Sequence, residues 1–249
     1  MSVSPSSVLS GMPGWETASV RDLDGGLTNR TWLVEAQGRK AVLKIDDAPR
    51  SAPYNSRQSE ARIQASAAAL GLASPVLVAT DTVYMTEYVE GAVWTREDLD
   101  NDGNLLRLAR SLRRMHSLPL TGRTFDAKAA ARGYAKNIEN ADEDLLRRNL
   151  RIVDAMPAPH NPCLCHNDLV AGNIIATPGI RFLDWEYACD NDPFFDLATL
   201  VAHHELSAER RRCLLDAYFD GDGAGWSERL AMHERFYAAI LWLWRESRP

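Results

Sequence analysis

Two neighbouring segments specify the architecture of this chain: Cys165-His166-Asn167-Asp168-Leu169-Val170-Ala171-Gly172-Asn173-Ile174-Ile175 and Phe182-Leu183-Asp184-Trp185-Glu186-Tyr187. Short apolar runs at 173–177 and 180–183, separated by Pro178-Gly179, predict a β-hairpin. Because a hairpin brings the end of its second strand back beside the start of its first, Asn173 and Asp184 are expected to lie close together.

Three polar side chains in these segments, Asp168, Asn173 and Asp184, point to metal-assisted chemistry. An amide oxygen and a carboxylate are ligands that Mg²⁺ accepts when phosphate oxygens and waters supply the rest, so Asn173 and Asp184 are the predicted metal ligands. Asp168, on the loop that enters the hairpin, is then available to accept a proton from a hydroxyl nucleophile. A loop aspartate, a following asparagine and an aspartate after a hairpin are the arrangement of kinase-type phosphoryl transfer.

The same residues resemble the phosphotransferase signature of choline and ethanolamine kinases and of their bacterial thiamine-kinase and aminoglycoside-phosphotransferase relatives. The matching positions are His166, Asp168, Asn173 and the string Asp184-Trp185-Glu186-Tyr187. This resemblance implies an α+β, bilobal protein-kinase-like fold with ATP and Mg²⁺ as cofactors. The small first lobe, an antiparallel sheet with one helix, is expected at residues 1–88, and a larger, mainly helical catalytic and substrate-binding lobe at 89–249.

A glycine-rich turn precedes the strand expected at 31–36. Exposed backbone N–H groups in such a turn can approach phosphate oxygens closely, although a Gly-Gly pair alone is more often only a turn. The resemblance to the ATP-covering loop of choline kinases implies that the turn contacts the nucleotide. The residues assigned to that contact are Gly25, Gly26, Thr28 and Asn29.

Lys44 lies in an apolar strand expected at 40–45, on the face opposite to Leu43 and Ile45. A lysine there is costly unless an anion meets it. The resemblance of this strand to the kinase V-A-I-K strand implies contact with the α- and β-phosphates. Glu60, in a helix expected at 56–70, is the candidate partner of Lys44, with Arg57 and Arg62 as competing partners for Glu60.

Strands expected at 75–80 and 83–89 form a second hairpin that resembles the hinge of this superfamily. In that role, backbone groups near Glu87 and Tyr88 would read the adenine edge. Helical spacing at 105–116 places His116 on an apolar side, where a hydrogen-bonded core histidine is the simplest interpretation. The span 127–154 is expected to be helical with an interruption at Gly133.

The end of the chain carries the candidate substrate contacts. Glu186 and Tyr187 follow the predicted metal ligand, and Trp244 lies on a closing helix expected at 226–245. Choline kinases use two late tryptophans in an aromatic cage for the quaternary ammonium. Here Trp242 and Trp244 point to nearly opposite sides of a helix, so at most one of them lines a pocket.

Two further residue sets have structural interpretations. Asp192 is expected to cap a helix that starts at Pro193, with Asp196 supporting the catalytic loop. Cys163, Cys165 and His166 have no second ligand pair at zinc-finger spacing, so the cysteines are interpreted as buried strand residues.

Composition limits the classes of partner. A formal net charge of -6 at pH 7 and a pI near 5.5 argue against a nucleic-acid partner and suit a cationic substrate. The chain shows no secretory leader and no apolar run of membrane-spanning length, so no membrane partner and a cytoplasmic location are expected.

The resemblance implies a kinase for a small cationic alcohol. Choline or ethanolamine is the first expectation, thiamine the second, and an aminoglycoside or amino sugar the third. A catalytically inactive kinase-fold binding protein is the alternative of a different class, although a binder has no need of Asp168.

Overall fold

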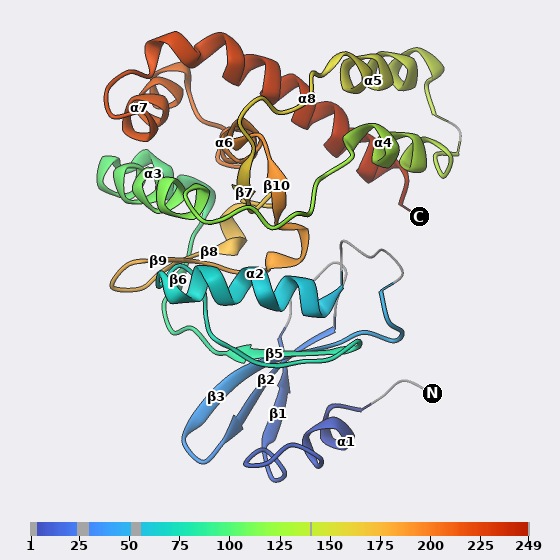
Figure 1. Ribbon diagram of the computed structural model, residues 1–249, viewed down its shortest axis with the longest axis vertical. Helices are drawn as coiled ribbons and strands as arrows, with labels where there is room; N and C mark the ends of the chain where they lie inside the picture. The colour runs from blue at the N-terminus through green and yellow to red at the C-terminus, as the bar shows by residue number, and fades with distance from the viewer. Residues whose placement is uncertain (1–3, 24–29, 51–55, 140, 249) are drawn as a thin grey trace. The chain divides into compact units, whose positions relative to one another are not determined.

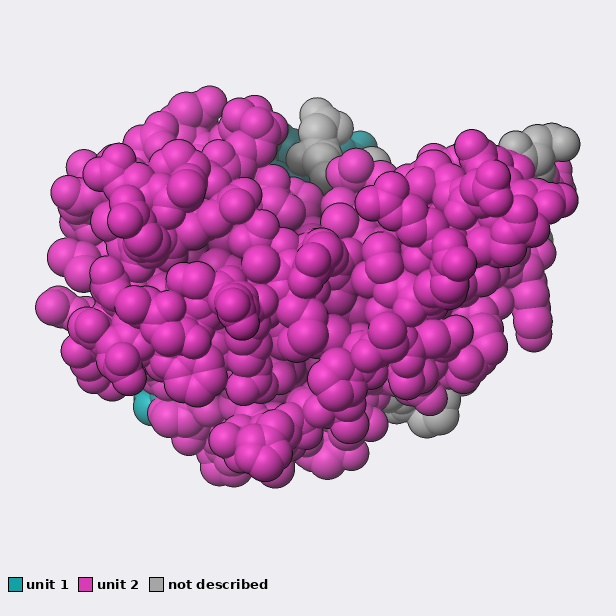
Figure 2. Space-filling model, turned by 90° about the horizontal axis from the view of Figure 1, so that it is seen from above, with its two compact units in different colours: residues 1–92, 175–187 teal, residues 93–174, 188–249 magenta. Residues whose placement is uncertain are grey.

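The computed structural model describes residues 4–23, 30–50, 56–139 and 141–248. The chain divides into two compact units, shown in different colours in Figure 2. Unit 1 comprises Met1–Ala92 and Ile175–Tyr187, and unit 2 comprises Val93–Ile174 and Ala188–Pro249. The functional boundary predicted between residues 88 and 89 stays a prediction.

Unit 1 is built on a five-stranded antiparallel sheet (Figure 1). The strands follow the order β1-β2-β3-β5-β4, so consecutive hairpins account for most of the pairing. They are β1 (Ser19–Asp22), β2 (Arg30–Ala36), β3 (Arg39–Ile45), β4 (Val76–Ala79) and β5 (Val83–Glu87). The predicted strands of this region are confirmed.

The two faces of this sheet differ in character. Alternate residues of β2 and β3, including Trp32 and Leu43, form an apolar core with Met85, Leu9 and Trp15. Leu9 belongs to a short helix, α1 (Pro5–Leu9), that the sequence interpretation did not include. Because side chains alternate along a strand, Lys44 points to the other face, as predicted.

One long helix, α2 (Arg57–Ala69), packs on this second face. It begins at the N-cap Ser56, whose side chain accepts from the Ser59 N–H, and it ends before Gly71 at a φ of 71°. Glycine adopts that left-handed conformation without steric cost, which explains the sharp stop. The Tyr84 hydroxyl of β5 donates to Gln64 of the helix at 2.9 Å and fixes helix against sheet.

The predicted hairpin is present as β8 (Ile174–Ala176) and β9 (Ile180–Phe182), preceded by the 3-10 turn η3 (Ala171–Asn173). A short strand, β6 (Ala92–Val93), pairs with β8. Gly91 permits this approach, because an added Cβ would lie 2.2 Å from the Ala176 carbonyl oxygen. After β9 comes the 3-10 turn η4 (Trp185–Tyr187), anchored by a hydrogen bond from Trp185 Nε1 to the Phe182 carbonyl.

Unit 2 is mainly helical (Figure 1). A small antiparallel pair, β7 (Cys163–Cys165) with β10 (Cys189–Asn191), lies among its helices and leads into the loop that carries Asp168. The helices are η2 (Arg96–Asp100), α3 (Asp102–His116), α4 (Ala127–Ala135), α5 (Glu143–Ala155), α6 (Pro193–His203), α7 (Ala208–Tyr218), η5 (Ala224–Trp226) and α8 (Ser227–Glu246). The sheet-bearing first part and helical second part confirm the predicted α+β class.

One detail differs from the sequence interpretation. Gly133 lies inside α4, and the helical span is interrupted only after Ala135, before the next helix begins at its N-cap Asp142. The helix expected at 226–245 is present as α8, on which Leu243 is buried and Trp244 is half-buried.

None of the helices in the described ranges combines the length and the apolar character that crossing a bilayer requires.

Candidate active site

Unit 1 holds Lys44 in an ion pair with Asp184. Lys44 Nζ lies 2.7 Å from Asp184 Oδ1, and the two side chains expose 13% and 30% of their surface. Asp184 lies two residues after the end of the short strand β9, and the backbone of Asp184 adopts a left-handed φ of 60°. Aspartate tolerates that conformation better than most residues, and such strain is most often found at functional positions.

The predicted pair between Lys44 and Glu60 is not found among the ion pairs of the described residues. Glu60 instead accepts from Arg57 Nη1 at 2.8 Å, which was one of the competing partners. The reason is local, because Arg57 and Glu60 are three residues apart on one face of α2. Lys44 still contributes favourable charge to Glu60, but through space.

Arg57 is the centre of a buried charge network. Its guanidinium is fully buried and binds Asp46 bidentately, with Nε and Nη2 each 2.7 Å from a carboxylate oxygen. Arg50 also contacts Asp46, at 3.3 Å, and its Nη1 lies 2.7 Å from Glu186 Oε2. An unbroken line of charges therefore joins Glu60 on α2 to Glu186 on η4, on the segment that also carries Asp184.

The pKa values of the two carboxylates bound to Arg57, those of Asp46 and Glu60, are shifted in opposite directions. Burial disfavours the charged form of Asp46, but the hydrogen bonds and charge of Arg57, followed by Arg50, outweigh burial and lower the Asp46 pKa. Burial dominates at Glu60 and raises its pKa, although Arg57 and Lys44 oppose the shift. Glu60 Oε1 has no hydrogen-bond partner in the described part of the chain, so this carboxylate is only half satisfied.

The predicted substrate residues occupy different environments. Glu186 is 4% exposed and its carboxylate is held by Arg50, whereas the side chain of Tyr187 is 38% exposed. Trp244 is half-buried at the end of α8, and the Arg248 guanidinium lies 3.9 Å from its ring centroid. The Trp244 ring therefore already has a cation on one face.

Unit 2 brings Asp168 and Asn173 together. Asn173 Nδ2 donates to the Asp168 carboxylate and to its backbone carbonyl, both at 2.9 Å. The turn η3, whose last residue is Asn173, produces this contact because it curls the backbone back towards Asp168. The amide nitrogen is thus occupied, and the amide oxygen is the atom of Asn173 suited to a cation.

Asp196 supports the loop that carries Asp168. Its carboxylate accepts from the backbone N–H groups of His166 at 2.8 Å and Asn167 at 2.7 Å. Asn167 has a left-handed φ of 63°, and its side chain accepts from Asn191 at 2.7 Å. The predicted supporting role of Asp196 therefore has a direct structural basis, and the predicted cap by Asp192 on α6 is also present.

His116 completes the support from α3. Its Nε2 lies 3.1 Å from Asp196 and its Nδ1 lies 2.6 Å from the Tyr218 hydroxyl. This confirms the interpretation as a hydrogen-bonded core histidine.

The structure says less about the other residues predicted to contact the nucleotide. Gly25, Gly26, Thr28 and Asn29 lie outside the described residues. At the predicted hinge, the Glu87 N–H donates to the Pro75 carbonyl at 3.0 Å and the Tyr88 N–H donates to the Lys40 carbonyl at 3.1 Å. Both N–H groups therefore bond within unit 1 itself, and the adenine contact stays a prediction.

Sequence reasoning missed Asp46 and Arg50 and assigned Arg57 only as a competitor. The one local signal was the spacing of Arg57 and Glu60 on a predicted helix. Nothing local indicates that Arg57 is fully buried, because burial depends on how α2 meets η4 and the end of β3.

The chain is similar in sequence to known proteins. Residues 19–232 match the model of a family described as "Phosphotransferase enzyme family". A protein named LicA from Haemophilus influenzae is 31% identical over 241 residues, which are 88% of this chain and 70% of the relative. A thiamine kinase from Escherichia coli O139:H28 is 27% identical over 230 residues, or 90% of this chain and 75% of the relative.

A solved structure gives the same result for the fold. The crystal structure of a choline/ethanolamine kinase family protein from Mesorhizobium loti has a TM-score of 0.73 and 25% identity, covering 95% of this chain and 82% of that one. The predicted protein-kinase-like α+β fold is thereby confirmed. With a family match that covers most of its length, the chain belongs to the phosphotransferase enzyme family.

Proposed function

We propose that this phosphotransferase is an ATP-dependent kinase that transfers the γ-phosphoryl group to the hydroxyl of a small cationic alcohol, choline or ethanolamine. The observation that carries the proposal is the double hydrogen bond from Asn173 to Asp168. It holds the carboxylate in one orientation, which a group that positions a hydroxyl and accepts its proton requires.

In the proposed reaction, the alcohol oxygen forms a bond to the γ-phosphorus while the bond between that phosphorus and the bridging oxygen of ADP breaks. The hydroxyl proton passes to Asp168. Because phosphoryl transfer depends mainly on positioning and electrostatics, Asp168 need only orient the hydroxyl and take the proton late. Asp196 would keep Asp168 in place through the two backbone N–H groups that precede it.

The donor atoms fit Mg²⁺, which accepts hard oxygen ligands. Asp184 supplies a carboxylate, and Asn173 supplies an amide oxygen because its nitrogen donates to Asp168. Bound Mg²⁺ would offset negative charge on the phosphate oxygens. Lys44 would bind the α- and β-phosphates, and its ion pair with Asp184 supports a shared role for the two residues.

In this proposal Glu60 does not form the direct pair with Lys44 that the sequence analysis predicts. Its direct partner is Arg57, so any influence on Lys44 acts through charge. Arg57 and Arg50 would then set the positions of Glu60 and Glu186 around the Lys44 and Asp184 pair. The nucleotide contacts of Gly25, Gly26, Thr28, Asn29, Glu87 and Tyr88 stay predictions.

The choice of alcohol is supported by the solved relative from the choline/ethanolamine kinase family. The cation on the Trp244 ring supports this residue as a candidate for binding an ammonium group, in exchange for Arg248. Exposed Tyr187 and buried Glu186 are the other substrate candidates. Thiamine is the second candidate, supported by relatives named thiamine kinase.

The test is ATP consumption by the purified protein with choline, ethanolamine, thiamine, amino sugars and aminoglycosides as acceptors. We expect the highest kcat/KM for choline or ethanolamine. Highest turnover of thiamine or an aminoglycoside would refute the choice of alcohol. Thermal stabilisation by nucleotide without any transfer would refute the kinase itself and favour a binding protein.

Variants connect the activity to the site. Asp184→Ala should lower kcat by on the order of 10²-fold or more, because it removes a preorganised electrostatic group. Asp47→Ala is the matched control, since Asp47 is an exposed aspartate in the same unit. An Asp184→Ala variant with near wild-type turnover would contradict the proposed role of Asp184.

A further inference from the structure

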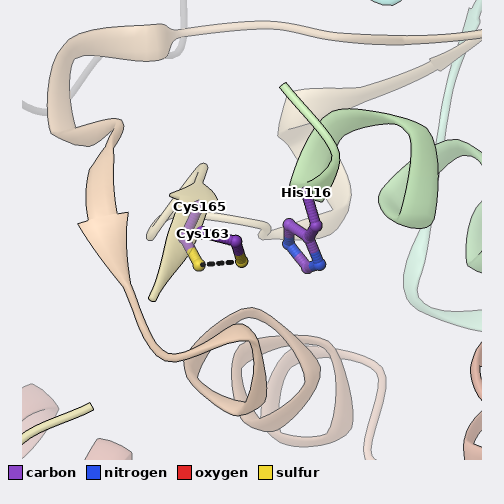
Figure 3. Close-up of side chains that lie close together, drawn as sticks. All are labelled: His116, Cys163 and Cys165. Carbon is purple, nitrogen blue, oxygen red and sulfur yellow. Dashed lines mark hydrogen bonds between the residues drawn. The ribbon is translucent and has the colours of Figure 1, made fainter. Parts of the chain in front are cut away.

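Two cysteines and a histidine form a compact cluster in unit 2. Cys163 and Cys165 are alternate residues of β7, so both side chains leave the strand on one face. Their sulfur atoms lie 3.6 Å apart. His116, at the end of α3, offers a ring nitrogen, and the three potential ligand atoms lie within 4.8 Å of one another. Figure 3 shows the imidazole beside the two sulfurs.

The sulfur separation matches a metal site. Two thiolates bound at about 2.3 Å to a tetrahedral Zn²⁺ lie roughly 3.8 Å apart. The pair therefore needs almost no rearrangement to share one ion. The sequence shows no local zinc motif here, because the third ligand, His116, comes from α3 and lies far from the two cysteines along the chain.

The hydrogen bonds of His116 prepare it as a ligand. Asp196 can only accept, so the ring nitrogen that faces it, Nε2, carries the hydrogen. In that tautomer Nδ1 has the lone pair, which accepts from the Tyr218 hydroxyl at 2.6 Å. Metal-binding histidines commonly donate their other N–H to a carboxylate in this way.

We propose that His116, Cys163 and Cys165 form a binding site for a thiophilic divalent cation of the Zn²⁺ class. The two sulfurs and His116 Nδ1 are three ligands, with a water in the fourth position. Binding forms two metal–sulfur bonds and one metal–nitrogen bond, breaks two S–H bonds and releases two protons to solvent. Tyr218 gives up its hydrogen bond to Nδ1, and the bond from Nε2 to Asp196 is kept.

Access and protonation suit an exchangeable ion. Cys163 is partly exposed and provides the approach, whereas Cys165 is fully buried. The ion would therefore enter from the side of Cys163, and binding requires that both thiols lose their protons.

The site would be coupled to the loop that carries Asp168. Asp196 accepts from His116 and from the N–H groups of His166 and Asn167. Cys165 also directly precedes His166 in the chain. The binding itself goes beyond the proposed kinase reaction, and its test needs no substrate.

The experiment is a titration of the reduced, chelator-treated protein with Co²⁺, which reports thiolate ligation by absorption, followed by displacement with Zn²⁺. We expect one Co²⁺ per chain, a sulfur-to-metal charge-transfer band and visible bands typical of a tetrahedral site. Zn²⁺ should bleach them and raise the midpoint of thermal unfolding. Absence of the charge-transfer band in the wild-type protein would overturn the proposal without reference to any variant.

Matched variants locate the ion. Cys163→Ser should abolish the band, whereas Cys213→Ser, which alters another partly exposed free cysteine of unit 2, should leave it unchanged. Tyr218→Phe removes the group that competes for Nδ1 and should tighten Co²⁺ binding about 3- to 10-fold. Retention of the band in Cys163→Ser, its loss in Cys213→Ser, or weaker binding in Tyr218→Phe would overturn the assignment.

Discussion

Replacing Arg57 with alanine tests the buried charge network of unit 1. The fully buried guanidinium makes three hydrogen bonds of 2.7 to 2.8 Å to two carboxylates, those of Asp46 and Glu60. Alanine removes the positive charge and leaves both carboxylates facing a low-dielectric interior. Arg50 still contacts Asp46, at 3.3 Å, but none of the described contacts replaces Arg57 beside Glu60.

The expected cost follows from this geometry. Removing one partner of a buried ion pair costs about 3–5 kcal/mol, because the remaining charge is uncompensated. Here Arg50 offsets part of the loss at Asp46, so the low end of that range is expected, about 3 kcal/mol. For a chain of this length, each kcal/mol lowers Tm by roughly 2–4 °C, which gives a decrease of about 6–12 °C.

Urea and thermal unfolding at pH 7 measure this cost, with Arg62→Ala as control on the exposed side of the same helix. The control should lie within about 0.5 kcal/mol of wild type. Arg57→Ala combined with Asp46→Asn and Glu60→Gln should recover part of the lost stability, because the penalty comes from unpaired charge. An Arg57→Ala effect no larger than that of Arg62→Ala would refute the network as a source of stability.

Three shorter predictions concern the same site. The folded-state pKa of Asp46 is lowered below its ordinary value of 3.8, so the stability that its charge contributes is complete above that value and is lost as the pH falls through the folded pKa. The difference in unfolding free energy between wild type and Asp46→Asn, measured by urea titration, should therefore shrink below about pH 4. A difference that stays constant with pH would contradict this prediction. Asp196→Ala should lower kcat by on the order of 10²-fold, because Asp168 loses its supporting contacts, and steady-state kinetics with unchanged kcat would reject this role. Arg50→Met should raise KM for the acceptor more than it lowers kcat if Glu186 binds substrate, and initial rates at varied acceptor concentration measure the split.

Local patterns were sufficient for much of the fold. The alternation around Lys44 predicted which sheet face it occupies, since side-chain direction in a strand has a period of two. The helix expected at 56–70 is present as α2, and it ends before Gly71, whose left-handed φ favours glycine. The hairpin of β8 and β9 followed from two short apolar runs around Pro178-Gly179.

The partners of charged groups were harder to predict. Glu60 had three possible cations by sequence, and the choice of Arg57 depends on helix geometry together with the burial of both side chains. The line from Arg57 through Asp46 and Arg50 to Glu186 joins residues far apart in sequence, so no periodicity contains it. The cysteine and histidine cluster was missed for the same reason, because a search for ligand pairs at fixed spacing cannot find His116.

The two carboxylates beside Arg57 differ in hydrogen bonding and in the direction of their pKa shifts, and this difference affects Lys44. Asp46 is fully satisfied and its pKa is lowered, whereas burial raises the pKa of Glu60 and one of its oxygens lacks a hydrogen bond. A half-satisfied carboxylate in a dry environment strengthens its attraction to any nearby cation. Lys44 acts on Glu60 through space, so Glu60 can favour one position of Lys44 without holding it. The proposed contact of Lys44 with phosphate requires this freedom, because Lys44 would have to leave its ion pair with Asp184.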